Sequence, residues 1–405
     1  MSDSPHIYVA LPVMDELDWM PATLEAISAQ SYPDVLVVAC VNQPDEWWED
    51  PEKKEVCRRN QRCMEHLHAY PGPIEIIDRS TRGKGWKGKR HGVGWARKTI
   101  MDRIAETAQP DDIILSLDAD TQFAPEYFAS VVRTLAANPD TMALSVPYYH
   151  LLPEDPVAAS AVLRYEIYMR YYLLNLFRID SPYAFSALGS AMACTVKAYR
   201  SVGGMTPKLS GEDFYFLQKF RKAGAICNWN EEKVFPVARF STRVFFGTGP
   251  AMIRGREGDW RSYPIYSSEL FDEIGESYRL FPSMFQKRVD TPVTRFLTAQ
   301  TGEQDPFALL RKNFKEPRLF VKACHEKFDG LRILQYLKQR HEPMEGGDEI
   351  NFLEWMRRFY SVDAGCQIPD KTKFSFAESN QEELDRLRDF LVREEDKCRK
   401  ENSFS

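Results

Sequence analysis

The sequence has 405 residues, of which 43% are hydrophobic and 28% are charged, and this composition is ordinary for a folded protein with one large domain or several smaller ones. Its net charge of −6 argues against a general nucleic-acid-binding surface, so we expect no nucleic-acid partner. The eight cysteines include no C-x-x-C pair and have no zinc-binding spacing, which favours a reducing compartment.

The apolar segments predict a cytoplasmic protein. The N-terminal segment has no basic stretch before its first apolar run, so it differs from a secretory signal peptide. The most apolar stretch, residues 158–179, is interrupted by four charged side chains, and we therefore expect no transmembrane segment. A core helix is one interpretation of this stretch, and a helix lying on the inner face of a membrane, as a peripheral contact, is the other.

Short apolar runs alternate with helical patterns over the first 150 residues. We expect strands over residues 7–12, 35–41, 74–77, 112–117 and 142–149. We expect helices over residues 23–30, 52–69, 93–108 and 124–137. This alternation predicts an α/β fold with a mostly parallel, Rossmann-like sheet and helices on both faces. From about residue 260 onward the pattern is mainly helical.

Polar side chains follow each of the first four expected strands. The strands run in turn into "PVMDE", "NQPDE", "DRSTRGKG" and "DADTQ". Parallel sheets of this kind bind ligands beyond the carboxyl ends of their strands. The sequence therefore predicts a ligand site at this edge of the sheet.

The stretch "LSLDAD" brings Asp118 and Asp120 to the end of an apolar strand. Residues two apart in an extended chain point the same way, so two carboxylates at this spacing favour a hard divalent cation such as Mg²⁺ or Mn²⁺. A turn that happens to carry two aspartates is the simpler alternative. A second acidic pair, Glu212 and Asp213, begins an expected helix, where the helix dipole alone is enough to favour it.

A basic cluster follows the third expected strand. Six of the thirteen residues from Arg79 to His91 are Lys or Arg, and residues 83–89 read G-x-x-x-x-G-K. A P-loop would follow its strand directly and end in Ser or Thr, whereas Arg90 stands at that position, so a nucleotide triphosphatase is disfavoured. The cluster is either a solvated loop or a site for a diphosphate or a base.

The ordered set of motifs resembles the inverting family 2 glycosyltransferases of the GT-A fold. The set runs from P-x-x-D-E at residues 12–16 through Asn42, the G-K and A-R pairs, D-A-D and the glycines of 189–204 to G-E-D at 211–213. The resemblance covers roughly residues 5–230. It implies transfer of a sugar from a UDP- or GDP-sugar to an acceptor hydroxyl, in a hexosyltransferase-type reaction that inverts the anomeric centre.

The resemblance also implies roles for individual residues. Asp213 would be the general base, with Glu212 beside it, and Asp118 and Asp120 would hold a Mg²⁺ or Mn²⁺ ion on the diphosphate. Acceptor or donor-sugar contacts would come from Gly189, Ser190 and Trp260. Nucleotide-binding candidates are Pro12, Asp15, Glu16, Asn42, Lys84, Lys89, Arg97 and Asp118.

Two departures from the family pattern keep alternatives open. Asn42 stands where the family usually has Asp, and no third metal ligand or Q-x-x-R-W motif is evident. A non-catalytic module that binds nucleotide or glycan is therefore one alternative. A sugar-nucleotide pyrophosphorylase is another, although such an enzyme is expected to have a glycine-rich loop directly after the first strand, and "ALPVMDELDWM" contains no glycine.

We expect a transferase domain over residues 1–258, with a nucleotide-binding half (1–120) and an acceptor half (121–258), and a mainly helical region over 259–405. The acceptor would be a glycan, as in polysaccharide biosynthesis, a lipid-linked molecule or a small molecule.

Overall fold

Strand β1 (Ile7–Val13) lies within a seven-stranded sheet whose strand order is β3-β2-β1-β4-β7-β6-β8. The computed structural model describes residues 4–88, 90–209, 211–240, 248–344, 346–360 and 374–402. Contacts divide the chain into two compact units. Unit 1 comprises residues 1–162, 185–257 and 399–405, and unit 2 comprises residues 163–184 and 258–398.

The strands of unit 1 are mostly parallel. Strand β1 pairs in parallel with its neighbours β2 and β4, and β2 pairs in parallel with β3. Strand β7 runs antiparallel to β4 and β6, and β5 pairs with β9 in a separate two-stranded sheet. The remaining strands are β2 (Val35–Asn42), β3 (Ile74–Arg79), β4 (Ile113–Ser116), β5 (Thr121–Phe123), β6 (Thr141–Ser145), β7 (Met192–Thr195), β8 (Ala225–Cys227) and β9 (Val234–Pro236).

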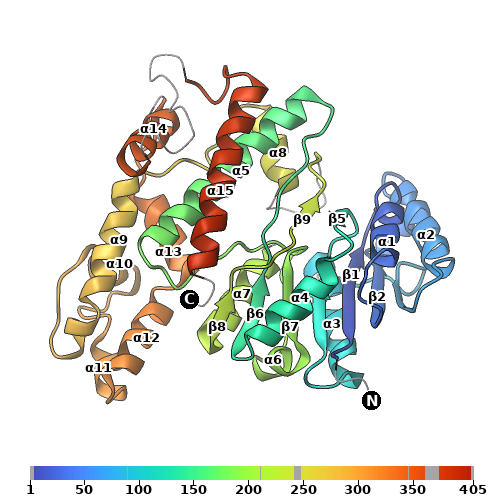
Figure 1. Cartoon of the computed structure of the whole chain (residues 1–405), viewed down its shortest axis with the longest axis horizontal. Coiled ribbons are helices and arrows are strands. Elements are labelled where there is room, and N and C mark those ends of the chain that lie inside the picture. Colours follow the sequence, from blue (N-terminus) through green and yellow to red (C-terminus); the bar gives the residue numbers. More distant parts are fainter. Residues whose placement is uncertain are drawn as a thin grey trace. The chain divides into compact units, whose positions relative to one another are not determined.

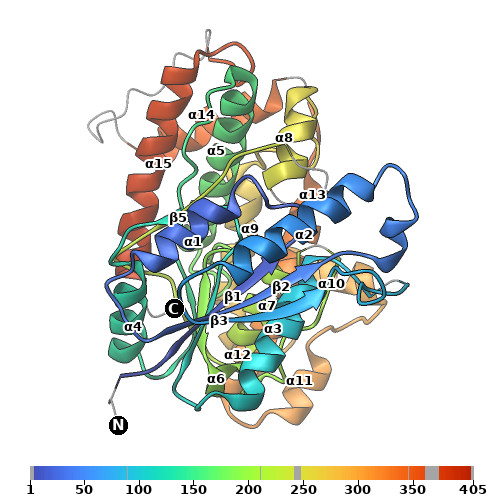
Figure 2. The same ribbon diagram turned by 90° about the vertical axis from the view of Figure 1, so that its right-hand side faces the viewer.

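Helices cover both faces of the sheet, because its central strands are apolar on both sides. One face carries the main hydrophobic cluster, to which α1, α2 and α4 contribute, and α3 packs on the other face against β1 and β2 (Figures 1 and 2). The helices of unit 1 are α1 (Met20–Ser28), η1 (Asp45–Trp48), α2 (Lys54–His68), α3 (Val93–Thr107), α4 (Tyr127–Ala137), α6 (Val196–Ser201), α7 (Glu212–Ala223) and α8 (Thr248–Arg256).

The expected α/β fold with a mostly parallel sheet and a helical C-terminal part is confirmed. The first five expected strands and the four helices between them all form, with ends that differ by up to four residues. Strand β4 ends at Ser116, and the D-A-D stretch therefore forms a turn after it.

Unit 2 is helical. Two further helices, α5 (Pro156–Arg178) and α15 (Gln381–Glu401), have residues in both units. The helices that lie wholly in unit 2 are α9 (Ser268–Leu280), η2 (Pro282–Phe285), α10 (Pro292–Thr301), α11 (Ala308–Asn313), α12 (Pro317–Lys327), α13 (Gly330–Arg340) and α14 (Gly347–Phe359).

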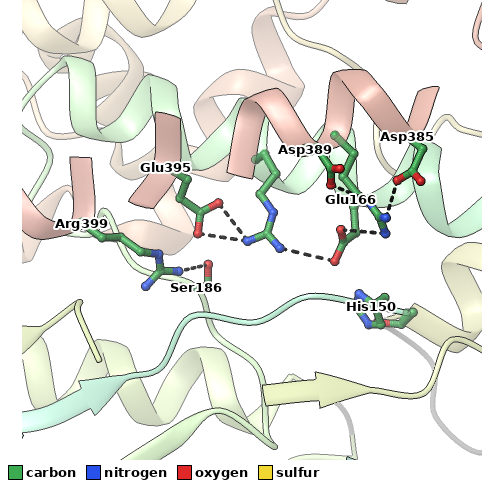
Figure 3. Close-up of polar contacts among 10 residues, drawn as sticks. His150, Glu166, Ser186, Asp385, Asp389, Glu395 and Arg399 are labelled. Carbon is green, nitrogen blue, oxygen red and sulfur yellow. Dashed lines mark hydrogen bonds and ion pairs between the residues drawn. The ribbon is translucent and has the colours of Figure 1, made fainter. Parts of the chain in front are cut away.

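The charged side chains in the apolar helix α5 are explained by ion pairs within unit 2. Arg170 is buried, and its Nη1 donates to both carboxylate oxygens of Glu395 on α15, at 2.9 and 3.0 Å. Its Nη2 donates to Glu166 one turn earlier on α5, at 3.3 Å (Figure 3). Tyr171 packs its ring edge-on against Trp355, with ring centroids 4.8 Å apart. These contacts explain why residues 163–184, which we expected in the transferase domain, belong to the helical unit.

The last turn of α15 belongs to unit 1. Buried Arg399 donates to the backbone carbonyls of Ser145 at 3.2 Å and Asn228 at 2.8 Å. It also donates to the hydroxyl of Ser186, at 2.8 Å (Figure 3). The unit that carries the sheet is therefore completed by a residue from near the C-terminus.

No helix within the described ranges is both long enough and apolar enough to cross a bilayer.

Candidate functional site

The loop after β1 is fixed by α2. Asp15 has a positive φ of 58°, a conformation that aspartate tolerates better than most residues. Its backbone N–H donates to Asn60 Oδ1 at 2.8 Å, and its carboxylate accepts from Arg59 Nε at 2.5 Å. The next residue, Glu16, is buried, and its carboxylate accepts from Arg239. The two acidic residues of the P-x-x-D-E motif therefore have different partners.

Pro12 and Asn42 are both buried in the sheet. Pro12 lies opposite Cys40 in the parallel pairing of β1 and β2. The Asn42 Nδ2 donates to the backbone carbonyl of Val13 at 3.0 Å, and Oδ1 accepts from the indole N–H of Trp86 at 3.3 Å. The amide is thus bonded at both ends, and an aspartate at this position would lose the donor to Val13.

Two cations of the basic loop pair with carboxylates of their own unit. Lys84 Nζ donates to Asp78 Oδ2 at 3.1 Å, and Arg82 bonds to Glu49. Although burial raises the pKa of Asp78, hydrogen bonds from the Thr81 and Ser80 backbone hold it below its usual range. Lys89 lies outside the described residues.

The D-A-D turn directs its two carboxylates to different arginines. Asp118 Oδ1 accepts from Arg97 Nη2 at 2.5 Å, and Asp120 Oδ2 accepts from Arg239 Nη2 at 2.6 Å. The side chain of Asp118 is 37% exposed, whereas that of Asp120 is 14% exposed. Because the strand ends before the turn, the period-two argument for converging side chains does not apply to this pair.

Arg97 on α3 connects two of the motifs. Its guanidinium is fully buried, and its Nη1 donates to Glu212 Oε1 at 2.5 Å while Nη2 bonds Asp118. A Cβ placed on Gly189 would lie 2.4–2.7 Å from the guanidinium atoms, so only glycine leaves space for it. Neighbouring Ser190 is also buried. Arg97 is therefore held between carboxylates and a glycine backbone, in the interior of unit 1.

The second acidic pair opens helix α7. Gly211, at the N-cap, has a φ of 73°, which favours glycine. Burial raises the pKa of Glu212 to about 7 against the opposing effect of Arg97, and neighbouring Asp213 adds to the rise. Desolvation also raises the pKa of Asp213, again opposed by Arg97. Asp213 Oδ1 accepts from the backbone N–H of Phe214 at 2.7 Å, and no ion pair joins it to a cation of the described residues.

Arg239 is a site residue that sequence reasoning missed. It follows β9, whose Pro236 lies opposite Thr121 of β5, immediately after the D-A-D turn. The segment "PVARF" around it matches no motif. Only the strand pairing, which joins parts of the chain far apart in sequence, brings Arg239 to Asp120.

Asp118 and Asp120 at the D-A-D turn offer carboxylate oxygens, which are the ligand type that a hard divalent cation binds. Among the described residues, no three His, Cys, Asp or Glu side chains gather as a metal site. Mg²⁺ characteristically binds through one or two carboxylates together with substrate phosphates, and Asp118 and Asp120 supply such oxygens. Asp118 Oδ2 has no hydrogen-bond partner in the described part of the chain, so one carboxylate oxygen remains available.

Trp260 belongs to unit 2. Its ring lies 5.0 Å from the guanidinium carbon of Arg164, which is itself buried and bonded to Asp348. Its observed contact is thus with an arginine of the helical unit.

The family model that matches this chain agrees with the resemblance given by its motifs. The family model described as "Glycosyltransferase like family 2" matches residues 5–232. A solved structure of S. aureus TarS 1-349 in complex with UDP-GlcNAc is similar, with 10% identity, a TM-score of 0.42, and coverage of 95% of this chain and 90% of that one. GalNAc-T7 with UDP, GalNAc and Mn²⁺ has 12% identity and a TM-score of 0.35, covering 72% of this chain and 52% of that one. No curated protein matches the sequence.

Proposed function

The chain belongs to glycosyltransferase-like family 2, and from this premise we propose that it moves a sugar from a nucleotide-diphosphate sugar to an acceptor hydroxyl with inversion. The observation that carries the proposal is the buried guanidinium of Arg97, which joins the D-A-D turn to the first turn of α7. Asp118, which we place on the donor side, and Glu212, which neighbours the proposed base, are thereby bonded to one guanidinium. Inverting transfer requires both groups to be placed about one anomeric carbon, and a shared guanidinium helps to hold them relative to each other.

We assign the general base to Asp213. The acceptor hydroxyl is a weak nucleophile until a carboxylate accepts its proton, which typically contributes about 10²- to 10⁴-fold in rate. Its neighbour Glu212 is already engaged by Arg97, whereas Asp213 has no cation pairing among the described residues. The raised pKa of Asp213 also makes it a stronger base than an ordinary aspartate.

The leaving group of this reaction is a nucleoside diphosphate, on which negative charge grows as the glycosidic bond breaks. We propose that Asp118 and Asp120 hold a Mg²⁺ or Mn²⁺ ion, which when bound supplies electrostatic stabilisation to that diphosphate. Arg97 forms an ion pair with Asp118 and fixes its orientation. The proposed donor is a UDP-sugar or a GDP-sugar.

The proposal is tested by replacing Asp213 with Asn. Asp213→Asn is isosteric and removes only the basic oxygen, so transfer should be lost while calorimetry still detects UDP or GDP binding. Asp111→Asn changes an exposed aspartate of the same unit and should leave turnover unchanged. Normal turnover in Asp213→Asn would refute the base assignment. Nucleotide binding by the wild-type chain without transfer or donor hydrolysis would favour a non-catalytic binding module.

A further inference from the structure

Arg239 lies between two carboxylates that come from different loops. Its Nη2 is 2.6 Å from Asp120 Oδ2 and 2.5 Å from Glu16 Oε2. All three side chains are largely withdrawn from solvent, with exposures of 19% for Arg239, 14% for Asp120 and 6% for Glu16. One nitrogen therefore serves two acids, one of which belongs to the proposed cation site.

The backbone fixes this arrangement. The Val237 N–H donates to the Asp120 carbonyl at 3.1 Å, which continues the pairing of β5 with β9 up to the turn itself. The side chain is not bonded at every donor, because within the described residues its buried Nε has no hydrogen-bond partner, and the guanidinium carbon lies 5.6 Å from the Trp19 ring. The guanidinium is thus bonded to these two carboxylates through its Nη2, and its position can change without a change in the backbone.

A guanidinium and a divalent cation cannot share the Asp120 oxygen without strong repulsion. The repulsion is large because like charges only a few ångströms apart are weakly screened at the effective dielectric of a protein site. Glu16 offers the guanidinium a second carboxylate at no greater distance than Asp120. Arg239 can therefore release Asp120 and keep one ion pair.

We propose that Arg239 is an internal counter-ion of Asp120 in the donor-free protein, that it competes with the divalent cation for this carboxylate, and that Glu16 retains it when the cation binds. This inference rests on the metal assignment of the proposed function. Its consequence is an order of binding: the cation binds weakly to the free chain and tightly together with a diphosphate, whose oxygens add ligands and negative charge.

The competition is tested by Mn²⁺ binding without any donor, followed by the electron paramagnetic resonance signal of free Mn²⁺. Arg239→Met keeps the side-chain length but removes the charge, and should bind Mn²⁺ about ten-fold more tightly than wild type. Arg239→Lys keeps the charge and should stay near wild type. Arg133→Met is the matched control, because this arginine pairs with Glu231 at an exposed position.

A double-mutant cycle isolates the role of Glu16. Glu16→Gln alone should weaken Mn²⁺ binding, because Arg239 is then left with Asp120 as its remaining acid. In the Arg239→Met background the same change should have little effect. If Glu16→Gln weakens Mn²⁺ binding equally in both backgrounds, Glu16 acts on the cation directly and the transfer of Arg239 is overturned.

The outcomes separate this inference from the proposed function. Equal Mn²⁺ affinity of wild type and Arg239→Met, both folded by circular dichroism, overturns the competition but leaves the metal assignment standing. Absence of Mn²⁺ binding in every variant, with or without UDP or GDP, overturns both. Loss of binding in Asp120→Asn, together with the gain in Arg239→Met, supports both.

Discussion

Asp118 and Glu212 are bonded to the same guanidinium, each at 2.5 Å from a different nitrogen of Arg97. One carboxylate belongs to the turn after β4 and the other to the first turn of α7, so the arginine couples two segments that are far apart in the sequence. The planar fork of arginine suits this task, whereas lysine presents a single point charge. This coupling makes Arg97 a positioning residue in the proposed mechanism.

Replacing Arg97 with Lys should therefore disable the site more than it unfolds the protein. The shorter ammonium reaches one carboxylate at a time, and we expect kcat/KM to fall about 100-fold because reacting groups are misplaced. Stability should fall by about 1–3 kcal/mol, because one buried carboxylate is left without its bond. Arg103→Lys, on the exposed side of the same helix, is the control for steady-state kinetics and urea unfolding. Equal kinetic losses in the two variants would contradict the coupling.

A methyl group at position 189 should displace the same arginine from the other side. The added Cβ of Gly189→Ala would lie 2.4–2.7 Å from the guanidinium, and overpacking of this kind costs about 1–3 kcal/mol. Gly224→Ala places a Cβ 2.7 Å from Met142 Cγ, an equally close contact with an uncharged, flexible side chain. We expect both variants to lose thermal stability but only Gly189→Ala to lose kcat/KM. Unchanged kinetics in Gly189→Ala would show that Arg97 can shift without consequence.

Much of this fold was predictable from the sequence, and the reasons differ from element to element. The apolar run of β2 and the period of α3 are local patterns, and both formed within one residue of the expected bounds. The pairing of β5 with β9 is not local, since three-residue strands carry little pattern. Arg239 therefore escaped prediction, although the acids that it contacts were both recognised.

The bonds of Asn42 escaped prediction for a different reason. A departure from the family pattern shows that the side chain at this position differs, but it does not show which atoms form the compensating hydrogen bonds. In this chain the compensation is a buried amide donor to Val13 and an acceptor for Trp86.

Restoring the residue usual in the family should accordingly harm this protein. Asn42→Asp replaces the Nδ2 donor by an oxygen that faces the Val13 carbonyl, which should cost about 1–3 kcal/mol in unfolding free energy. Trp86→Phe removes the 3.3 Å bond to Oδ1 and part of the ring over which Arg79 lies, but it keeps the Val13 bond and should cost less. Urea denaturation of both variants provides the comparison. A neutral or stabilising Asn42→Asp would mean that this amide donor is dispensable.

Folding stability should depend on pH through Glu212. Burial raises its folded-state pKa from 4.5 to about 7, so the folded protein binds the proton more tightly than the unfolded chain does. Between these two values the folded state carries more protons, and stability must fall as pH rises, by an amount on the order of a few kcal/mol. Glu212→Gln cannot titrate and should show a smaller decline between pH 5 and pH 8, because only the raised pKa of Asp213 then contributes in the same direction. The control is Glu55→Gln, an exposed acid in the first turn of α2.

The dependence of kcat/KM on pH should reflect the ionisation of Asp213. The base must be ionised, and desolvation raises its pKa, so kcat/KM should begin to decrease with falling pH above the ordinary aspartate value of about 3.9. The residual rate of Asp213→Asn should not show this acidic limb. Rate measurements from pH 4 to pH 9 at saturating cation test the assignment, and an acidic limb that persists in the variant would transfer the role to another group.

The position of Arg399 has a consequence for the order in which the protein is made. Its guanidinium is bonded to the backbone carbonyls of Ser145 and Asn228, in the unit that holds the sheet. A nascent chain emerges from the ribosome N-terminus first, so the sheet is synthesised long before this arginine becomes available. During translation the two carbonyls must stay hydrated or find temporary partners, and the unit that holds the sheet forms these bonds only after residue 399 has been synthesised.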